Sequence, residues 1–294
     1  MRAYLELVRV PNLFTAVGDV VAGYLLLSRG VGVDRRALVA VAAASVALYA
    51  AGVVLNDYFD RDLDRVERPE RPVPSGRVTP RSALLLGGGL LGLGCLLALA
   101  AGAVSGLVAF LLATCIVLYD ARGKRVPYVG SLNMGACRFL NVALGASAVP
   151  LGRIEPWLWF VLPVASIVMA YIAAVTVLST GEVWGGTRAV AAAVFAVLVG
   201  VVAAVLWLGM TDRLSDSTYL GFLALFATAT FSVVGRVVLS PTAPNIRRAI
   251  KVCVLSLLLL DAAFAAGAGG LGYGLLVALL IVPSVLTARL FAVT

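Results

Sequence analysis

Histidine is absent from this 294-residue chain, and acidic and basic side chains together make up only 13% of it. The lack of histidine excludes imidazole metal ligands and histidine general bases, so any bound metal must be a hard cation held by oxygen atoms. The scarcity of charge, about half of what soluble domains carry, excludes a water-soluble globular enzyme. Cysteine is sparse as well: the four residues lie in apolar stretches without a Cys-x-x-Cys pair, which favours small buried side chains over disulfides.

Apolar residues dominate what is present, at 62% of the chain with a mean hydropathy of +1.03. Because a membrane-spanning helix needs about 20 such residues, the apolar runs predict ten approximate spans: 12–28, 37–57, 83–101, 104–120, 132–149, 157–179, 189–209, 217–239, 246–267 and 271–292. We therefore predict an all-α fold in which residues 1–294 form a single integral-membrane domain, a polytopic transmembrane helical bundle of nine to ten spans. A Gly-rich turn at 267–270 leaves open whether residues 246–292 form one span or two. The first span contains Asp19 and no convincing cleavage site, so we expect a retained helix and not a signal peptide.

Positive charge is distributed unevenly over the two sides of this predicted bundle. Sixteen Lys and Arg residues fall on one side and five on the other. The first group is Arg2, Arg9, Arg61, Arg65, Arg68, Arg71, Arg77, Arg81, Arg122, Lys124, Arg125, Arg188, Arg236, Arg247, Arg248 and Lys251; the second is Arg29, Arg35, Arg36, Arg153 and Arg213. Since Lys and Arg are enriched in cytoplasmic loops, we predict that the basic side is cytoplasmic and that the protein lies in the plasma membrane. The net charge of +8 then reflects topology, and no nucleic-acid partner is expected.

Acidic residues gather at one place, where an apolar span ends in the segment NDYFDRDLD. Four oxygen-bearing side chains of this segment fall within about 100° of helix circumference; they are Asn56, Asp57, Asp60 and Asp64. Carboxylates held this close repel one another unless a cation neutralises them. Oxygen ligands of this kind suit Mg²⁺, which commonly bridges to phosphate oxygens.

Basic residues follow the acidic segment in the same predicted loop and in the next loop of that side; they are Arg68, Arg71, Arg77, Lys124 and Arg125. A metal on one side and guanidinium or ammonium groups on the other are what a diphosphate requires. We therefore predict a diphosphate site with Mg²⁺ at this side of the bundle. The alternative is a solvated helix end with surface ion pairs.

These motifs resemble those of the UbiA superfamily of intramembrane prenyltransferases. NDYFDRDLD matches its N-D-x-x-D-x-x-x-D motif, RPERPVPSGRV is similar to its R-P-x-x-S-G-R stretch, and LYDARGKR resembles its aromatic-then-basic loop. The resemblance implies a helical bundle around a lipid-open central cavity in which Mg²⁺ holds an isoprenyl diphosphate. It assigns Mg²⁺ binding to Asn56, Asp57, Asp60 and Asp64, diphosphate contact to Asn56, Arg71, Arg77 and Lys124, and catalysis to Asp60, Asp64 and Lys124.

The loop between the sixth and seventh predicted spans departs from the family pattern. The family carries a second Asp-rich motif there, whereas this chain reads LSTGEVWGGTR, with Glu182 as the only carboxylate. We expect Glu182 to ligate a second Mg²⁺ weakly, together with water and diphosphate oxygens. The altered loop resembles a branch found in bacterial gene clusters and often called EboC-like. A tenth apolar segment also exceeds the nine that are usual in the family.

Polar residues inside the predicted spans are a further group of candidates. Asp19, Arg138 and Asn141 are expected to orient an acceptor hydroxyl or the diphosphate, because polar groups in a membrane usually face a cavity or one another. The alternative is a structural ion pair of Arg138 with Asp19 or Asp261. Aromatic faces can stabilise an allylic cation, and the candidates nearest the span ends are Tyr58, Phe59, Tyr119 and Tyr171.

The leading hypothesis is a Mg²⁺-dependent transferase that moves an isoprenyl group from its diphosphate to a small acceptor. The altered second loop favours a polar alcohol or cyclitol as acceptor, and an aromatic or quinone precursor is the alternative. A hypothesis of another class is a non-catalytic isoprenoid-lipid binding protein or transporter, which the intramembrane charges also suit. The expected partners are an isoprenyl diphosphate, an acceptor and membrane lipid; the donor chain length and the oligomeric state stay open.

Overall fold

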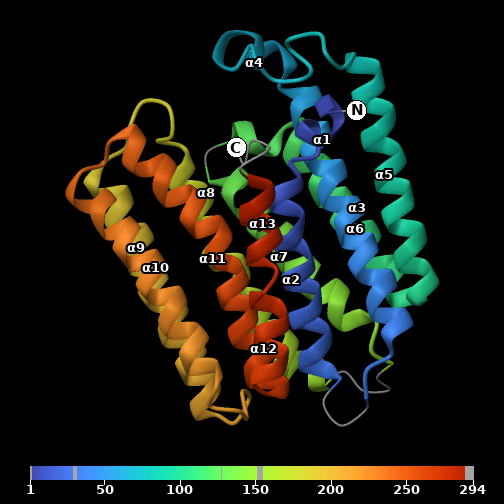
Figure 1. Cartoon of the computed structure of the whole chain (residues 1–294), viewed down its shortest axis with the longest axis vertical. Coiled ribbons are helices and arrows are strands. Elements are labelled where there is room, and N and C mark those ends of the chain that lie inside the picture. The colour runs from blue at the N-terminus through green and yellow to red at the C-terminus, as the bar shows by residue number, and fades with distance from the viewer. Residues whose placement is uncertain (1, 29–31, 127, 151–154, 289–294) are drawn as a thin grey trace.

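The computed structural model of the chain describes residues 2–28, 32–126, 128–150 and 155–288, and these residues contain helices and no β-strand. In chain order the helices are α1 (Arg2–Leu7), α2 (Val10–Leu27), α3 (Arg35–Phe59), α4 (Arg61–Glu67), α5 (Pro80–Ala101), α6 (Ala103–Ala121), α7 (Val129–Ser147), α8 (Leu162–Ser179), α9 (Arg188–Met210), α10 (Tyr219–Leu239), α11 (Ala243–Gly269), α12 (Leu271–Ala278) and α13 (Ile281–Ala288). A 3₁₀ turn at Gly123–Arg125 precedes α7, and a π-helical turn at Trp157–Val161 leads into α8. The prediction of an all-α fold is confirmed (Figure 1).

Nine helical segments among the described residues are long and apolar enough to cross a membrane. They are α2, α3, α5, α6, the π-helical turn with α8, α9, α10, α11, and α12 with α13. Helix α7 has 19 residues, but its polar side chains include Asn133, Arg138 and Asn141, and it is not one of the nine. It nevertheless packs against α2, α6 and α8, as Figure 1 shows. The prediction of nine to ten spans is therefore confirmed.

Several spans begin at residues that satisfy the free N–H groups of a helix start. Asp34 accepts hydrogen bonds from the backbone N–H groups of Arg36 and Ala37 at the start of α3. Thr79 caps α5 through the N–H of Ser82, and Pro80 follows at the first helical position, where no N–H is needed. These polar caps mark where the chain turns back into the bundle.

Burial divides the bundle into central and peripheral helices. In the most apolar stretch of α2, 78% of the residues are buried, and in that of α11 72% are, whereas the shares are 22% for α5 and 28% for α9. The exposed residues of α5 include large apolar ones, such as Leu85 and Leu96, which suits a face turned toward lipid tails. The central helices α2 and α11 pack against each other and, with α7, hold the interior of the molecule.

Two glycines bring α2 and α7 into direct backbone contact. A Cβ on Gly23 would lie 2.0 Å from the carbonyl oxygen of Val142, and a Cβ on Gly145 would lie 2.0 Å from that of Val20. Only glycine permits this reciprocal approach, because any side chain would overlap the facing carbonyl. The contact fixes the position of α7, the helix that carries Arg138 and Asn141.

The carboxyl-terminal residues form two passes and not one. Helix α11 ends at Gly269, and Gly270 has a left-handed φ of 91°, from which the chain turns into α12. The predicted span 271–292 corresponds to the candidate span Leu271–Ala288, whose helix is interrupted where α12 ends at Ala278 and α13 begins at Ile281. Pro283 accounts for the break: it has no N–H to donate, and its ring crowds the carbonyl of Leu279. Residues 289–292 of that span lie outside the described residues.

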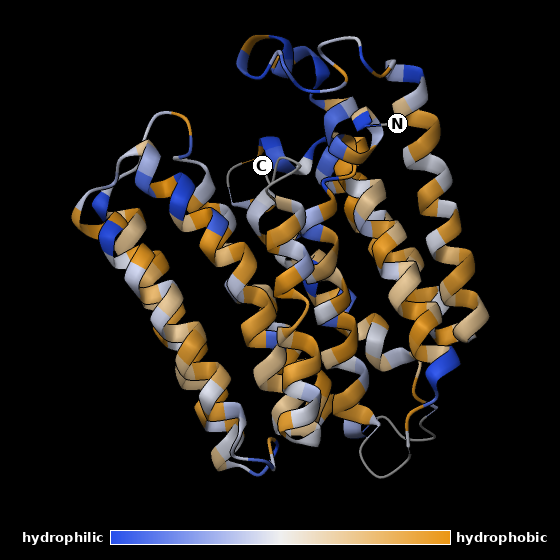
Figure 2. Ribbon diagram, in the orientation of Figure 1, coloured by the Kyte–Doolittle hydropathy of each residue, from blue (hydrophilic) through white to orange (hydrophobic). Residues whose placement is uncertain are grey.

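All the segments with motifs lie at one end of the bundle. Helices α1 and α4, the turn at Gly123–Arg125 and the loop between α8 and α9 share the end at the top of Figure 1. Figure 2 shows hydrophilic segments at the same end and long hydrophobic stretches below it. The arrangement follows from the antiparallel passes, because each pair of spans returns the chain to the same side.

Candidate functional site: a cavity with a charged mouth

A cavity of about 590 Å³ opens among α2, α3, α6, α7, α8 and α11, beneath α4 and the turn at Gly123–Arg125. Its middle is lined by apolar side chains, namely Leu48, Val53, Leu112, Ile116, Met134, Ile172, Val175, Ile250, Val254 and Leu257. Polar side chains gather at the motif-bearing end and again deeper in the bundle. The shape suits a ligand with a long apolar body and a polar head.

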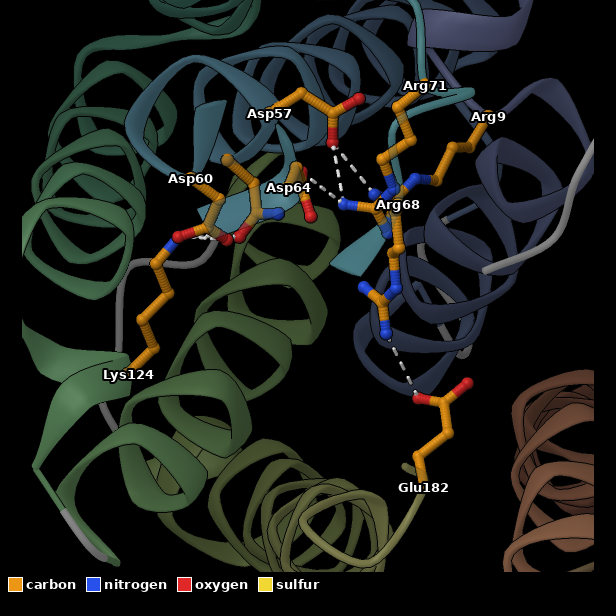
Figure 3. A network of polar contacts seen from close by, with 9 residues as sticks. Arg9, Asp57, Asp60, Asp64, Arg68, Arg71, Lys124 and Glu182 are labelled. Atoms are coloured by element: carbon orange, nitrogen blue, oxygen red, sulfur yellow. Dashed lines mark hydrogen bonds and ion pairs between the residues drawn. The ribbon is translucent and has the colours of Figure 1, made fainter. Parts of the chain in front are cut away.

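The first polar group, which we call the mouth cluster, comprises Arg9, Asn56, Asp57, Asp60, Asp64, Arg68, Arg71, Lys124 and Glu182. Lys124 extends from the turn before α7 toward the end of α3 (Figure 3). Its Nζ lies 2.7 Å from Asp60 Oδ2 and donates a 2.9 Å hydrogen bond to Asn56 Oδ1. Because Asn56 and Asp60 are four residues apart on adjoining turns, they present their oxygens to the same point.

The other two carboxylates of the motif point away from Lys124. Arg71 Nη1 lies 2.8 Å from Asp64 Oδ2 and 3.4 Å from Asp57 Oδ1, and Arg9 Nη2 lies 2.9 Å from the same Asp57 oxygen. Asp57 and Asp64 are each only 2% exposed, so the guanidinium groups offset the cost of burying their charge. Arg9 holds a left-handed φ of 47°, a rare conformation for a residue other than glycine, which ends α1 and starts α2.

Helix α3 ends at Phe59 and α4 begins at Arg61, and the four predicted Mg²⁺ ligands in these two helices and at Asp60 between them form two pairs. Asn56 and Asp60 line the cavity, whereas Asp57 and Asp64 do not. Among the described residues no three carboxylate or thiol side chains converge closely enough to enclose a metal ion.

The donor set nevertheless fits a hard cation. The ammonium group of Lys124 already sits where the oxygens of Asn56 and Asp60 converge, which marks a position for positive charge. Oxygen atoms are the ligands that Mg²⁺ prefers, and it commonly completes its shell with water and phosphate oxygens. The cavity side of this pair is open to such ligands.

Glu182 reaches the mouth from the loop between α8 and α9. Its Oε2 lies 3.8 Å from Arg68 Nη2, and both side chains line the cavity. Figure 3 shows Arg68 extending across the mouth toward Glu182. The structure thus places Glu182 in the same cluster as the first motif, as the sequence predicts, although it contacts an arginine there.

Arg77 does not face the cavity. It forms an ion pair with Glu6 of α1 and donates a 2.6 Å hydrogen bond to the backbone carbonyl oxygen of Glu70. The hydrogen bond from Arg77 holds the pKa of Glu6 below its ordinary value. Of the basic residues predicted to contact a diphosphate, the structure therefore brings Arg71 and Lys124 into the mouth cluster and leaves Arg77 on the surface.

A second polar group, the inner cluster, comprises Thr15, Asp19, Ser45, Arg138, Asn141 and Asp261. Arg138 Nη1 lies 2.8 Å from Asp19 Oδ2, and Asn141 donates a 2.9 Å hydrogen bond to the same oxygen. Ser45 donates to Asn141 Oδ1 at 2.6 Å. The predicted ion pair of Arg138 is therefore formed with Asp19, while Arg138, Asn141 and Ser45 also line the cavity.

Asp261 of α11 completes the inner cluster from the opposite side of α2. It is fully buried, and a Cβ added to Gly18 would lie 2.6 Å from its Oδ2. It interacts with the Asp19 carboxyl group, so two acidic groups face one guanidinium. Glycine at position 18 makes the room for this side chain.

Aromatic residues take different positions relative to the cavity. Tyr119 lines it at the mouth, whereas the Tyr171 hydroxyl is buried and donates a 2.7 Å hydrogen bond to the carbonyl oxygen of Cys253. The Tyr58 ring packs under the guanidinium of Arg61, whose Cζ lies 4.8 Å from the ring centroid. Tyr49 was not expected from the sequence, yet it lines the cavity, and Arg138 Cζ lies over its ring, 5.0 Å from the ring centroid.

No local motif marks the other unexpected members of the site. Arg9 contributes to the predicted topology only by its charge, and Thr15 and Ser45 are single hydroxyl groups within apolar spans. Ser45 is recognisable only through its distant partner, Asn141. Their roles depend on contacts between helices far apart in the sequence.

Fold and site together define a class of protein: a polytopic α-helical membrane protein with an apolar cavity whose mouth is lined by carboxylates and basic side chains. The sequence profile of the UbiA prenyltransferase family matches residues 16–252. The chain belongs to the UbiA prenyltransferase family.

Curated relatives carry the name digeranylgeranylglyceryl phosphate synthase. The protein of Ignicoccus hospitalis is 44% identical over 133 residues, which are 45% of this chain and 42% of the relative. The protein of Methanopyrus kandleri is 36% identical over 172 residues, 57% of this chain and 61% of the relative. The chain thus spans about half the length of the curated relatives it matches.

Solved structures share the fold. A UbiA homolog from Aeropyrum pernix in its apo form superimposes with a TM-score of 0.71 at 19% identity, covering 85% of this chain and 96% of that one. A UbiA homolog from Archaeoglobus fulgidus bound to GPP and Mg²⁺ gives a TM-score of 0.57 at 15% identity, covering 94% and 99%.

Proposed function

We propose that this protein transfers an isoprenyl group from an isoprenyl diphosphate to a small alcohol acceptor in a Mg²⁺-dependent reaction. The observation that carries the proposal is the placing of Lys124 between Asn56 and Asp60 at the charged mouth of an apolar cavity. Membership of the UbiA prenyltransferase family supports the reaction class. A transporter has no need for this one-sided array of carboxylates and bases.

The donor binds with its diphosphate in the mouth cluster and its hydrocarbon tail along the apolar middle of the cavity. Lys124 and Arg71 neutralise the diphosphate as it departs, and charge-assisted contacts of this kind strengthen as negative charge develops on the leaving group. Tyr119, on the cavity wall beside the mouth, offers its ring to the allylic carbon. The walls exclude bulk water from the reacting carbon.

Asn56 and Asp60 would hold Mg²⁺, and the carboxylates of Asp57, Asp64 and Glu182 would add negative charge around it. When bound, the metal withdraws electrons from the diphosphate and makes it a better leaving group. The UbiA homolog from Archaeoglobus fulgidus binds GPP together with Mg²⁺, and this pairing of ligands supports the metal's part in the proposal.

An alcohol is the acceptor that the inner cluster favours. Ser45, Asn141 and Arg138 present hydrogen-bonding groups deep in the cavity, and Arg138 already has Asp19 as its counter-ion. The relatives are named for the synthesis of digeranylgeranylglyceryl phosphate, a compound with isoprenoid groups on a glyceryl unit, and this name supports a polyol, with or without phosphate. An aromatic quinone precursor is the second candidate, because the Tyr49 ring borders the same space.

The test uses the purified protein in lipid vesicles with geranylgeranyl diphosphate and either Mg²⁺ or EDTA. Acceptors are offered in three sets: a glyceryl phosphate lipid, an uncharged polyol or cyclitol, and an aromatic acid. We expect Mg²⁺-dependent release of diphosphate together with an ether product from the alcohol sets. Asp60→Asn should abolish turnover, whereas Asp62→Asn, an exposed neighbour that pairs with Arg65 outside the cavity, should retain it.

The outcomes separate the candidate functions. Product from the aromatic acid alone supports the quinone-precursor hypothesis. A protein that binds the diphosphate without releasing it under any condition, and whose binding is unchanged in Asp60→Asn, is a non-catalytic lipid binder, and the proposal is then wrong.

A further inference from the structure

Asp120 is a buried carboxylate on the cavity wall that the site described so far does not use. It is the penultimate residue of α6, is 2% exposed and lines the cavity beside Tyr119. Its Oδ2 has no hydrogen-bond partner among the described residues. A buried carboxyl oxygen without a partner is costly, and on the wall of a cavity a bound ligand can supply the partner.

The other carboxylates that line the cavity are occupied. Asp60 is bound by Lys124 and Glu182 lies against Arg68. Asp120 alone among the described lining carboxylates has no cationic nitrogen within 4.0 Å of its oxygens. The chain has no histidine, so this carboxylate is the available proton acceptor in the cavity.

The proposed reaction requires such a group. When an alcohol oxygen attacks the allylic carbon, its O–H proton must leave, and a group on the cavity wall can accept it. Asp120 lines the same cavity as Asp60 and Lys124 of the mouth cluster, where the diphosphate departs, and as Arg138 and Asn141 of the inner cluster, where the acceptor's polar groups bind. A proton acceptor is needed on the wall of this shared cavity.

We propose that Asp120 is the catalytic base that accepts the acceptor's hydroxyl proton, an inference that rests on the proposed function. The bond between C1 of the donor and the diphosphate oxygen breaks, and its electron pair leaves with diphosphate. The acceptor oxygen supplies the pair that forms the new C–O bond, and its proton passes to Asp120 Oδ2. The proton then leaves with diphosphate through the mouth, which restores the carboxylate.

The test compares Asp120→Asn with Asp62→Asn, a matched exchange of carboxylate for amide on the exposed side of α4. We measure kcat and KM for transfer to the alcohol acceptor, and separately the binding of a non-hydrolysable isoprenyl thiodiphosphate with Mg²⁺. For Asp120→Asn we expect kcat to fall by about 100-fold or more, with analogue binding and donor KM unchanged. The fall in transfer rate from wild type to Asp120→Asn should be smaller with a fluorinated alcohol of the same shape, because its more acidic hydroxyl needs a base less.

Each other result contradicts the assignment. Transfer by Asp120→Asn at the wild-type rate leaves the proposed function standing and excludes Asp120 as the base. Parallel loss of transfer and of analogue binding makes Asp120 part of the donor or metal site instead. An equal loss with both alcohols removes the proton-transfer role, and a wild-type protein that prenylates no alcohol overturns the proposed function and this inference together.

Discussion

At the scale of single residues, the structure gives different positions to side chains for which the sequence motifs predict the same role. Lys124 and Arg77 both follow the acidic segment in the family pattern, yet Lys124 bridges Asn56 and Asp60 while Arg77 pairs with Glu6 on the surface. Local spacing cannot reveal this difference, because each outcome depends on how a loop folds back over the bundle. Lys124 and Arg77 should therefore differ in how much they contribute to donor binding and turnover.

We predict that Lys124→Met lowers turnover by about 100-fold, since a positioned positive group at a developing anion contributes that much. Arg77→Met, the same chemical change on the surface, should leave the KM for the donor and kcat within about threefold. The measurement is steady-state kinetics with varied donor. Equal losses in the two variants would mean that the loop rearranges on binding and brings Arg77 to the diphosphate.

Glu182 carries the second residue-scale prediction. It is the only carboxylate of its loop and lies 3.8 Å from Arg68 across the mouth. Glu182→Gln should raise the Mg²⁺ concentration needed for half-maximal turnover without abolishing activity, because Asn56 and Asp60 remain. Titrating Mg²⁺ against rate checks this. If the Mg²⁺ curves of variant and wild type coincide, the loop has no part in metal binding.

The N-D-x-x-D-x-x-x-D spacing was enough to locate the mouth cluster but not to sort its members. A regular helix places all four side chains on one face, whereas in the structure Asp57 and Asp64 contact Arg71, and Asp57 also contacts Arg9. Their arginine partners come from other segments. Long-range pairing of this kind needs the folded chain.

At the scale of helices, hydropathy located every span because the bilayer demands a length that composition reveals. Helix α7 was also found, although its polar residues make it less apolar than its neighbours. The break between α12 and α13 was missed, since Pro283 lies within an otherwise uninterrupted apolar run. The close approach of α2 and α7 was equally hidden, because Gly23 and Gly145 are two among thirty glycines.

That helix contact supports a third prediction. Gly145→Ala places a methyl group 2.0 Å from the carbonyl oxygen of Val20, so α2 and α7 must separate, at a cost of about 1–3 kcal/mol. Gly92→Ala on α5 meets no atom within 4 Å and should be neutral or slightly stabilising. Thermal aggregation of the detergent-solubilised variants distinguishes the two.

Activity provides a second readout of the same substitution. Because the contact of α2 with α7 sets Arg138 against Asp19, Gly145→Ala should also raise the KM for the acceptor more than the KM for the donor. Unaltered stability and acceptor KM would show that the helices tolerate the extra methyl group by a local shift.

At the scale of the whole molecule, the apolar cavity and its charged mouth impose a direction on the reaction. The donor's diphosphate enters and leaves at the motif-bearing end, where α4 and the loop between α8 and α9 lie (Figure 2). This is the side to which the predicted topology assigns sixteen Lys and Arg residues. Excess Lys and Arg favours the cytoplasmic side. A water-soluble diphosphate pool on that side would then feed the site directly.

The last prediction tests this orientation with single cysteines introduced at opposite ends. Trp184, 92% exposed between α8 and α9, marks the motif-bearing end, and the exposed Ser217 between α9 and α10 marks the other. In intact cells a membrane-impermeant maleimide should label Ser217→Cys and not Trp184→Cys, and inverted vesicles should reverse the pattern. The wild-type protein is the control, because its four cysteines lie within helices. Labelling of Trp184→Cys from outside intact cells would place the mouth on the outer face, and the donor would then have to be supplied from that side.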